Sequence, residues 1–130
     1  MARILVVDDD EATRRLLDLI LLESGEHEVL HAGVAQEALA HLEAGSPDLL
    51  VLDMRLPDMS GVELLQHVRR GGYVGPVLAL TASSSRDPIV AELRAEPDPP
   101  SILLKPFDVD ELAVRVEALL SGKTSPARAG

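Results

Sequence analysis

The chain has 130 residues, of which 46% are apolar and 26% charged, a balance that fits one globular domain and excludes a disordered segment. Its net charge of −10, with one Tyr, one Phe and no Trp, argues against a surface that binds nucleic acid. The sequence has no Cys, no signal-peptide pattern and no run of membrane-spanning length, so we exclude disulfides and membrane insertion and expect a cytoplasmic protein.

Apolar runs and helical patterns alternate along the chain. The first run, Ile4–Val7, predicts a strand, and a helix is expected from about Glu11 to Glu23. A leucine-rich stripe at helical spacing is expected to place this helix against the core; its members are Leu16, Leu17, Ile20 and Leu21. The next run, Val29–Leu30, is short and flanked by histidines, which predicts a strand near an edge of the sheet.

Three more apolar runs predict strands in the rest of the chain: Leu49–Leu52, Val77–Leu80 and Ile102–Leu104. Helical periods lie between these strands and after the last one, and polar residues such as Ser60 and Asp108 stand where helices should begin. The fourth helix is predicted to be short, from near Pro88 to near Ala95, because prolines follow it.

Five strand–helix units in succession predict an α/β fold. We expect a (βα)5 arrangement, in which a doubly wound, parallel, five-stranded sheet carries helices on both faces. Residues 1–121 are assigned to this domain, and the small, polar residues 122–130 to a flexible tail or linker. In such a sheet ligands bind beyond the carboxyl ends of the strands, so the residues that follow the strands are the candidates for function.

Polar side chains follow four of the five predicted strands. Asp8 and Asp9 follow the first strand, Asp53 the third, Thr81 the fourth and Lys105 the fifth. Crowded carboxylates repel one another unless a cation offsets their charge, and Mg²⁺ prefers oxygen ligands of this kind. A carboxylate can also attack phosphorus to form an aspartyl phosphate, whose oxygens a lysine and a hydroxyl can stabilise. The set predicts a site for magnesium and a phosphoryl group.

Four segments of the sequence, in the same order and spacing, resemble the signature blocks of the response-regulator receiver domain. They read "ILVVDDD", "LLVLDMRLPDMSG", "LALTA" and "LLKPF". The resemblance covers residues 3 to 121 and identifies the chain as a phospho-acceptor module of two-component signalling. It implies a flavodoxin-like sheet with the strand order 2-1-3-4-5.

The resemblance also implies a role for each residue of the site. Asp53 would accept a phosphoryl group from a sensor histidine kinase or a phosphotransfer protein. Thr81 would bond a phosphoryl oxygen and Lys105 would pair with it, and the Lys105–Pro106 peptide bond would be cis. Asp8, Asp9, Asp53 and the backbone carbonyl of Met54 would hold Mg²⁺, while Ala82 would leave room for the phosphoryl group. The protein would then signal to a downstream partner or effector domain through a conformational change, and it would not be a turnover enzyme.

Two features depart from the family pattern. The family generally places Tyr or Phe three residues before the lysine, and this chain has Ile102 there. Just upstream the sequence reads "AEPDPPS", whose three prolines should stiffen the approach to the last strand. A second hypothesis therefore stays open, in which the chain is a receiver-like docking module that signals without phosphorylation. A receiver that forms part of a longer regulator is a further possibility.

Asp53, Asp10 and the histidines can each be interpreted in another way when taken singly. Haloacid-dehalogenase-like phosphatases also use an Asp after a strand but need a second Asp two residues later, where this chain has Arg55. Asp10 is expected only to complement the dipole of the first helix. The four histidines lack the spacing of metal ligands and are expected at the surface; they are His27, His31, His41 and His67.

Overall fold

The computed structural model describes residues 2–24, 27–81 and 88–122 of the chain. Strands and helices alternate as predicted, and the elements are β1 (Ala2–Val7), α1 (Glu11–Ser24), β2 (His27–Ala32), α2 (Ala35–Ala44), β3 (Leu49–Asp53), α3 (Gly61–Arg70), β4 (Val77–Thr81), α4 (Pro88–Arg94), β5 (Ser101–Leu104) and α5 (Val109–Leu120). All five predicted strands are present, and the structure extends each of them by one to four residues. None of the helices in the described ranges is both long and apolar enough to cross a membrane.

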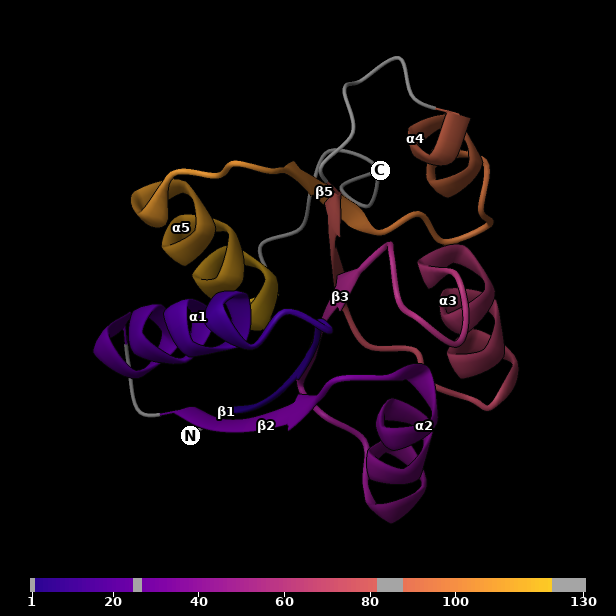
Figure 1. Cartoon of the computed structure of the whole chain (residues 1–130), viewed down its shortest axis with the longest axis horizontal. Coiled ribbons are helices and arrows are strands. Elements are labelled where there is room, and N and C mark those ends of the chain that lie inside the picture. The colour runs from indigo at the N-terminus through magenta and orange to yellow at the C-terminus, as the bar shows by residue number, and fades with distance from the viewer. Residues whose placement is uncertain (1, 25–26, 82–87, 123–130) are drawn as a thin grey trace.

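The strands form one parallel sheet in the order β2-β1-β3-β4-β5, which confirms the doubly wound topology and the order implied by the resemblance. β2 lies at one edge, as its short apolar run predicted. β3 and β4 are buried along their whole length, because helices cover both faces of the central sheet. Figure 1 shows α1 and α5 on one face of the sheet and α2, α3 and α4 on the other.

Alternate residues of each strand point to two separate cores. On the α1 and α5 side, Ile4 and Val6 of β1 pack with Leu17 and Leu21 of α1 and with Leu112 of α5. The other core fills the space beneath α2, α3 and α4, and its strand members include Leu5, Val7, Leu50, Leu52 and Ala79. Because β1, β3 and β4 contribute to both cores, the carboxyl ends of these strands are fixed from both faces.

The leucine-rich stripe of α1 is only partly in the core. Leu17, Ile20 and Leu21 are buried, but the prediction was wrong for Leu16, which is 42% exposed. Leu16 precedes Leu17 by one position and therefore points about 100° away around the helix, outside the strip that faces the sheet. Leu19 and Leu22 are also exposed on this outer side of α1.

Helix starts are capped by polar side chains at two of the predicted positions. The Glu63 N–H donates to Ser60 Oγ at 3.1 Å at the start of α3. At the start of α5 the Asp108 carboxylate accepts from the Asp110 N–H at 2.8 Å. α4 ends at Arg94, as the following prolines predicted. These short-range signals place the helices so that the strand–helix loops gather at one end of the sheet.

Candidate functional site

The polar residues that follow the strands converge at the carboxyl edge of the sheet. Asp8 continues β1, since its N–H donates to the Ala32 carbonyl of β2 at 3.0 Å. Asp53 ends β3 and Thr81 ends β4. Lys105 follows β5, and its N–H donates to the Thr81 carbonyl at 2.7 Å. The parallel register therefore brings residues from four neighbouring strands to one place.

Lys105 connects the two buried carboxylates of this edge. Its Nζ lies 3.0 Å from Asp8 Oδ2 and 3.4 Å from Asp53 Oδ1. Asp8 is 1% exposed and Asp53 is 6% exposed, whereas the lysine side chain keeps partial contact with solvent. The Lys105–Pro106 peptide bond is cis, as predicted. The ammonium group of Lys105 therefore lies between the carboxylates of Asp8, which follows β1, and Asp53, which ends β3.

Three carboxylates of the site are close enough to share a metal ion. One oxygen from each of Asp8, Asp9 and Asp53 lies within 4.8 Å of the other two. Mg²⁺ binds oxygen at about 2 Å, so its ligands stand up to about 4 Å apart, and small side-chain shifts bring these three into range. Asp8 and Asp53 are buried while Asp9 is exposed, which leaves an open side for water and phosphate oxygens. The residues fit the predicted ion.

Burial and like charge shape the electrostatics of the site. Burial raises the pKa of Asp53 above its ordinary value, and the negative charge of Asp8 raises it further. Lys105 and the backbone N–H of Arg55 partly offset both effects. For Lys105 itself burial acts to lower the pKa, but its hydrogen bonds and ion pairs with Asp8 and Asp53 outweigh burial and raise it. An added cation would reduce the repulsion between these carboxylates.

The backbone carbonyl of Met54 is already engaged within the loop that follows β3. It accepts a hydrogen bond from the Gly61 N–H at 2.9 Å. The two segments touch closely, because a Cβ at Gly61 would lie only 2.6 Å from Met54 Cα. A carbonyl oxygen has two lone pairs, so the predicted role of Met54 as a metal ligand could use only the second.

The structure describes Thr81 and the residue before it, Leu80, but not the residue after it. Thr81 is 2% exposed at the end of β4, and the preceding residue, Leu80, accepts a hydrogen bond from the Met54 N–H at 3.1 Å. This bond fixes the end of β4 against the residue that follows Asp53. Ala82, predicted to leave room for a phosphoryl group, lies outside the described residues.

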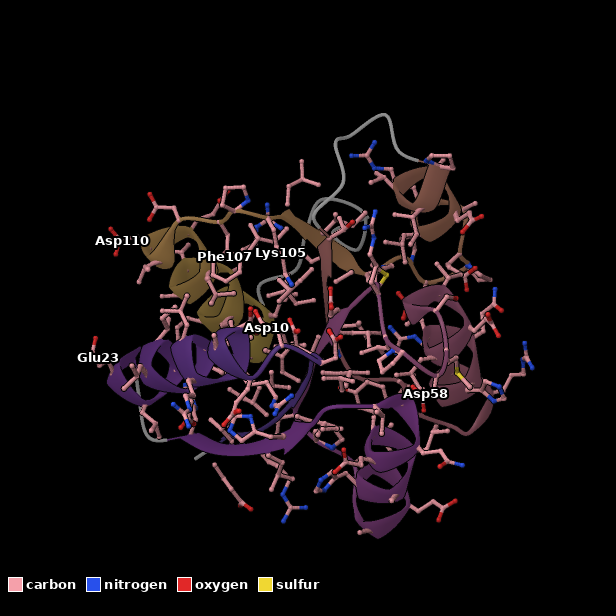
Figure 2. The ribbon with its side chains drawn as sticks, viewed as in Figure 1. Asp10, Glu23, Asp58, Lys105, Phe107 and Asp110 are labelled. Carbon is pink, nitrogen blue, oxygen red and sulfur yellow. The ribbon has the colours of Figure 1, made fainter. Side chains whose placement is uncertain are left out.

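Asp10 lies at the start of α1, where the prediction placed it to complement the helix dipole, and it also caps the helix by hydrogen bonds. Its Oδ1 accepts from the Ala12 N–H at 3.2 Å, and its Oδ2 accepts from the Thr13 hydroxyl at 2.7 Å. The hydrogen bond from Thr13 is the main reason that the pKa of Asp10 is lowered. Figure 2 shows Asp10 at the start of α1. Asp10 therefore supports the loop that carries Asp8 and Asp9.

Two residues that support the site were not predicted from the sequence. Asp58, in the loop after β3, caps α2: its two oxygens accept from the Ala35 N–H at 2.9 Å and the Gln36 N–H at 3.2 Å. Figure 2 shows Asp58 beside the start of that helix. Arg14 of α1 donates from Nη1 to the Asp8 carbonyl. Asp58 lies 23 residues from Ala35. Arg14, although only six residues from Asp8, reaches back over the loop outside any regular helical spacing, so neither contact has a local motif.

The histidines do not all lie at the surface. The prediction was wrong for His27, whose side chain is only 9% exposed and whose Nε2 lies 3.1 Å from Glu117 Oε1 of α5. His31 is half-buried beside Asp18, and His41 Nε2 contacts the His31 carbonyl at 3.2 Å. These contacts fasten the edge strand β2 to its neighbouring helices and lie away from the acidic site.

Residues 4–117 match the protein family described as the response regulator receiver domain. The chain is 43% identical over 125 residues to Response regulator MprA of Mycobacterium avium, and 40% identical over 119 residues to Transcriptional regulatory protein TrcR of Mycobacterium tuberculosis. These alignments cover 95% and 91% of this chain, but 53% and 45% of those two proteins. The chain thus spans about half the length of these curated relatives.

Solved structures share the fold over nearly the whole chain. The chemotaxis response regulator CheY4 of Vibrio cholerae superposes with a TM-score of 0.81 at 30% identity, covering 92% of this chain and 98% of that one. The response regulator TrrA of Thermotoga maritima, solved in complex with Mg²⁺-BeF, superposes with a TM-score of 0.78 at 35% identity, covering 92% and 99%.

Proposed function

Since the chain belongs to the response regulator receiver family of two-component signal transduction, we propose that it accepts a phosphoryl group on Asp53 and signals through the resulting change of shape. The observation that carries this proposal is the position of Lys105, whose Nζ stands between Asp8 and Asp53 at the carboxyl edge of the sheet. A buried acid next to a partly buried cation, open on one side to solvent, suits a nucleophile whose product gains negative charge.

We assign Mg²⁺ to Asp8, Asp9 and Asp53, with the Met54 carbonyl as a further ligand through its remaining lone pair. The ion would offset the repulsion among the carboxylates and the charge of the phosphoryl oxygens. Support comes from the grouping of the three carboxylate oxygens and from the burial that raises the pKa of Asp53.

In the proposed step an Asp53 carboxylate oxygen attacks the phosphorus of a phosphohistidine on the donor protein. The new O–P bond forms as the N–P bond breaks, and the electron pair of that bond returns to the donor's imidazole. Lys105, 3.4 Å from Asp53 Oδ1, would pair with a phosphoryl oxygen after the transfer, and the Thr81 hydroxyl would bond another. Each chain would take one phosphoryl group and later lose it to water, so the protein is proposed to be an acceptor and not a turnover enzyme.

The proposed partners follow from this role. The donor would be a sensor histidine kinase or a phosphotransfer protein. The output would be a downstream protein or an effector domain, which the greater length of the curated relatives supports. The proposal includes a cytoplasmic location, and that element rests on the family alone.

Treatment with a small phosphodonor tests the proposal. The purified chain is incubated with acetyl phosphate and Mg²⁺, and intact-mass spectrometry is expected to show one phosphoryl adduct. No adduct should form when a chelator is present in place of Mg²⁺. Asp53→Asn should show no adduct, whereas Asp110→Asn, which makes the same charge change on the surface of α5, should be phosphorylated normally.

Two results would overturn the assignment. An adduct that persists in Asp53→Asn would place the acceptor elsewhere. A wild-type chain that takes no phosphoryl group would favour the alternative hypothesis, a receiver-like module that docks to a partner without phosphorylation.

A further inference from the structure

The backbone of Asp8 is held by a side chain from the helix that follows it. Arg14 Nη1 donates to the Asp8 carbonyl at 2.6 Å, in a partly buried position. A charged donor to a carbonyl at this distance is among the stronger hydrogen bonds in proteins. The contact fixes the orientation of the peptide unit between Asp8 and Asp9, the two residues assigned to the metal.

With this contact every polar group of Asp8 has a partner. Its N–H donates to Ala32, its carbonyl accepts from Arg14, its Oδ1 accepts from the Asp10 N–H at 2.9 Å, and its Oδ2 contacts Lys105. Asp8 is nearly inaccessible to solvent, so each of these groups would be costly to leave without a partner. The arrangement leaves the carboxylate one orientation, facing the site.

The place of the guanidinium is itself restricted by the loop after β2. A Cβ at Gly33 would lie 3.2 Å from Arg14 Nη1 and 3.9 Å from its Cζ, so the side chain passes closely over this glycine. The Gly33 N–H donates to Glu37 Oε1 at 3.2 Å, which places a carboxylate near the same point. Arg14 thus lies against Gly33, in the loop between β2 and α2, as well as against the acidic loop.

We propose that Arg14 is a positioning residue of the metal site, which acts through its hydrogen bond to the main chain of Asp8. This inference rests on the proposed function, because it assumes that Asp8 and Asp9 hold Mg²⁺. Groups that orient metal ligands from behind commonly change metal affinity by about 10- to 100-fold when they are removed. The neighbouring Arg15 offers a matched control, since its side chain is 78% exposed and pairs only with Glu11 among the described residues.

The test measures Mg²⁺ affinity of the unphosphorylated chain by titration calorimetry. Arg14→Ala should weaken binding about 10-fold, while Arg14→Lys, which keeps the charge and one donor, should recover part of the loss. Arg15→Ala removes the same charge one position away and should leave the affinity within about two-fold. The Mg²⁺ concentration that gives half the maximal rate of phosphorylation by acetyl phosphate should rise in parallel for Arg14→Ala and stay near the wild-type value for Arg15→Ala.

The outcomes separate this inference from the proposal on which it rests. If the wild-type chain binds no Mg²⁺, the proposed function fails and the inference fails with it. If the wild type binds and Arg14→Ala binds equally well, only the inference is overturned. Equal weakening in Arg14→Ala and Arg15→Ala would also overturn it, because Arg15 makes no contact with Asp8 in the described part of the chain and the effect would then not depend on the hydrogen bond from Arg14. A thermal melt of each variant identifies any general loss of folding.

Discussion

Arg55 is the charged side chain nearest in sequence to the proposed acceptor, Asp53, on its carboxyl side. It is exposed, and its backbone N–H interacts with the Asp53 carboxylate. A guanidinium in this position can pair with phosphoryl oxygens and obstruct the water that would attack the phosphorus in line. Ser83, which stands two places beyond Thr81 as Arg55 stands two places beyond Asp53, lies outside the described residues.

Arg55→Ala is therefore expected to shorten the lifetime of the phosphorylated chain. Loss of the phosphoryl group should become roughly two- to five-fold faster, the change that about 0.5–1 kcal/mol of an exposed ion pair makes to a barrier. Decay is followed by mass spectrometry after removal of the phosphodonor, with excess Mg²⁺. Arg70 is an exposed arginine at the carboxyl end of α3, and Arg70→Ala should leave the decay rate unchanged. Decay of Arg55→Ala that is equal to or slower than that of the wild type would contradict the proposed role of Arg55.

Asp58 links the acceptor loop to α2 by capping that helix from outside. The residue at the N-cap position, Val34, has no side-chain hydrogen bond to offer, so the carboxylate of Asp58 takes its place. The Ala35 N–H is the main cause of the lowered pKa of Asp58. A carboxyl group with a lowered pKa stabilises the folded state at pH values above its unfolded pKa, and this contribution is lost as the pH falls through the folded pKa.

Asp58→Ala should lower the melting temperature at pH 7 by roughly 2–6 °C, since a lost cap destabilises a helix start. Asp58→Asn keeps one acceptor oxygen and should lose less. Below about pH 4 the difference between the wild type and Asp58→Ala should shrink, because protonation removes the wild-type advantage. Thermal melts from pH 7 to pH 3 measure this. A difference in melting temperature between the wild type and Asp58→Ala that does not change with pH would show that Asp58 acts by packing. As a control, Glu43→Gln at the other end of α2 should not lower the melting temperature.

At the scale of the elements, β5 and the segment before it are held on both sides. Arg115 of α5 donates from Nη1 to Ser101 Oγ at 2.9 Å and to the Ile102 carbonyl at 2.8 Å. On the other side Arg69 of α3 pairs with Asp98 at 3.2 Å, and Gln66 donates to Glu96 at 3.3 Å. The proline-rich segment is thus attached to α3 as well as stiffened by its own composition.

We expect phosphorylation to leave β5 largely unchanged. Ile102 is half-buried and has no aromatic ring that could turn inward, and α5 holds its strand by a hydrogen bond from Arg115. The conformational response to phosphorylation should therefore concentrate in the loop Ser83–Pro88. Residues 83–87 of that loop lie outside the described residues. Hydrogen exchange with and without beryllofluoride and Mg²⁺ tests this. Asp98→Asn, which weakens the Arg69 pair, should increase exchange across Ile102–Leu104, whereas Glu23→Gln should not. A large change at Ile102–Leu104 in the wild type with a silent Ser83–Pro88 loop would contradict the prediction.

At the scale of the whole molecule, local patterns predicted the elements and chain order predicted the contents of the site. Apolar runs located all five strands, and the residues that follow them are those that meet at the edge, as Asp8, Asp53 and Lys105 show. The spacing of the leucines in α1 did not determine which of them face the core, so the prediction that Leu16 is buried was wrong. The sheet order came from the resemblance, because alternation of strands and helices allows several orders.

The contacts that could not be predicted are those between segments without a local signal. Asp58 resembles any loop aspartate until the fold brings α2 beside it, and His27 resembles a surface residue until α5 places Glu117 next to it. Arg14 lies on a helix with another arginine beside it, and only the three-dimensional structure distinguishes the two. Such contacts depend on tertiary geometry that periodicity does not encode.

The ion pair between Lys105 and Asp8 joins residues 97 positions apart, and this has a consequence for the order in which the chain becomes functional. During synthesis the carboxylates of β1 and β3 emerge well before β5, and until then the lysine that pairs with them is missing. The partial sheet would carry its negative charges without that partner at the very edge where they repel one another. A nascent chain that stops before Lys105 would therefore hold the nucleophile but lack its positive counterpart, so competence to take a phosphoryl group would arrive only with the last strand.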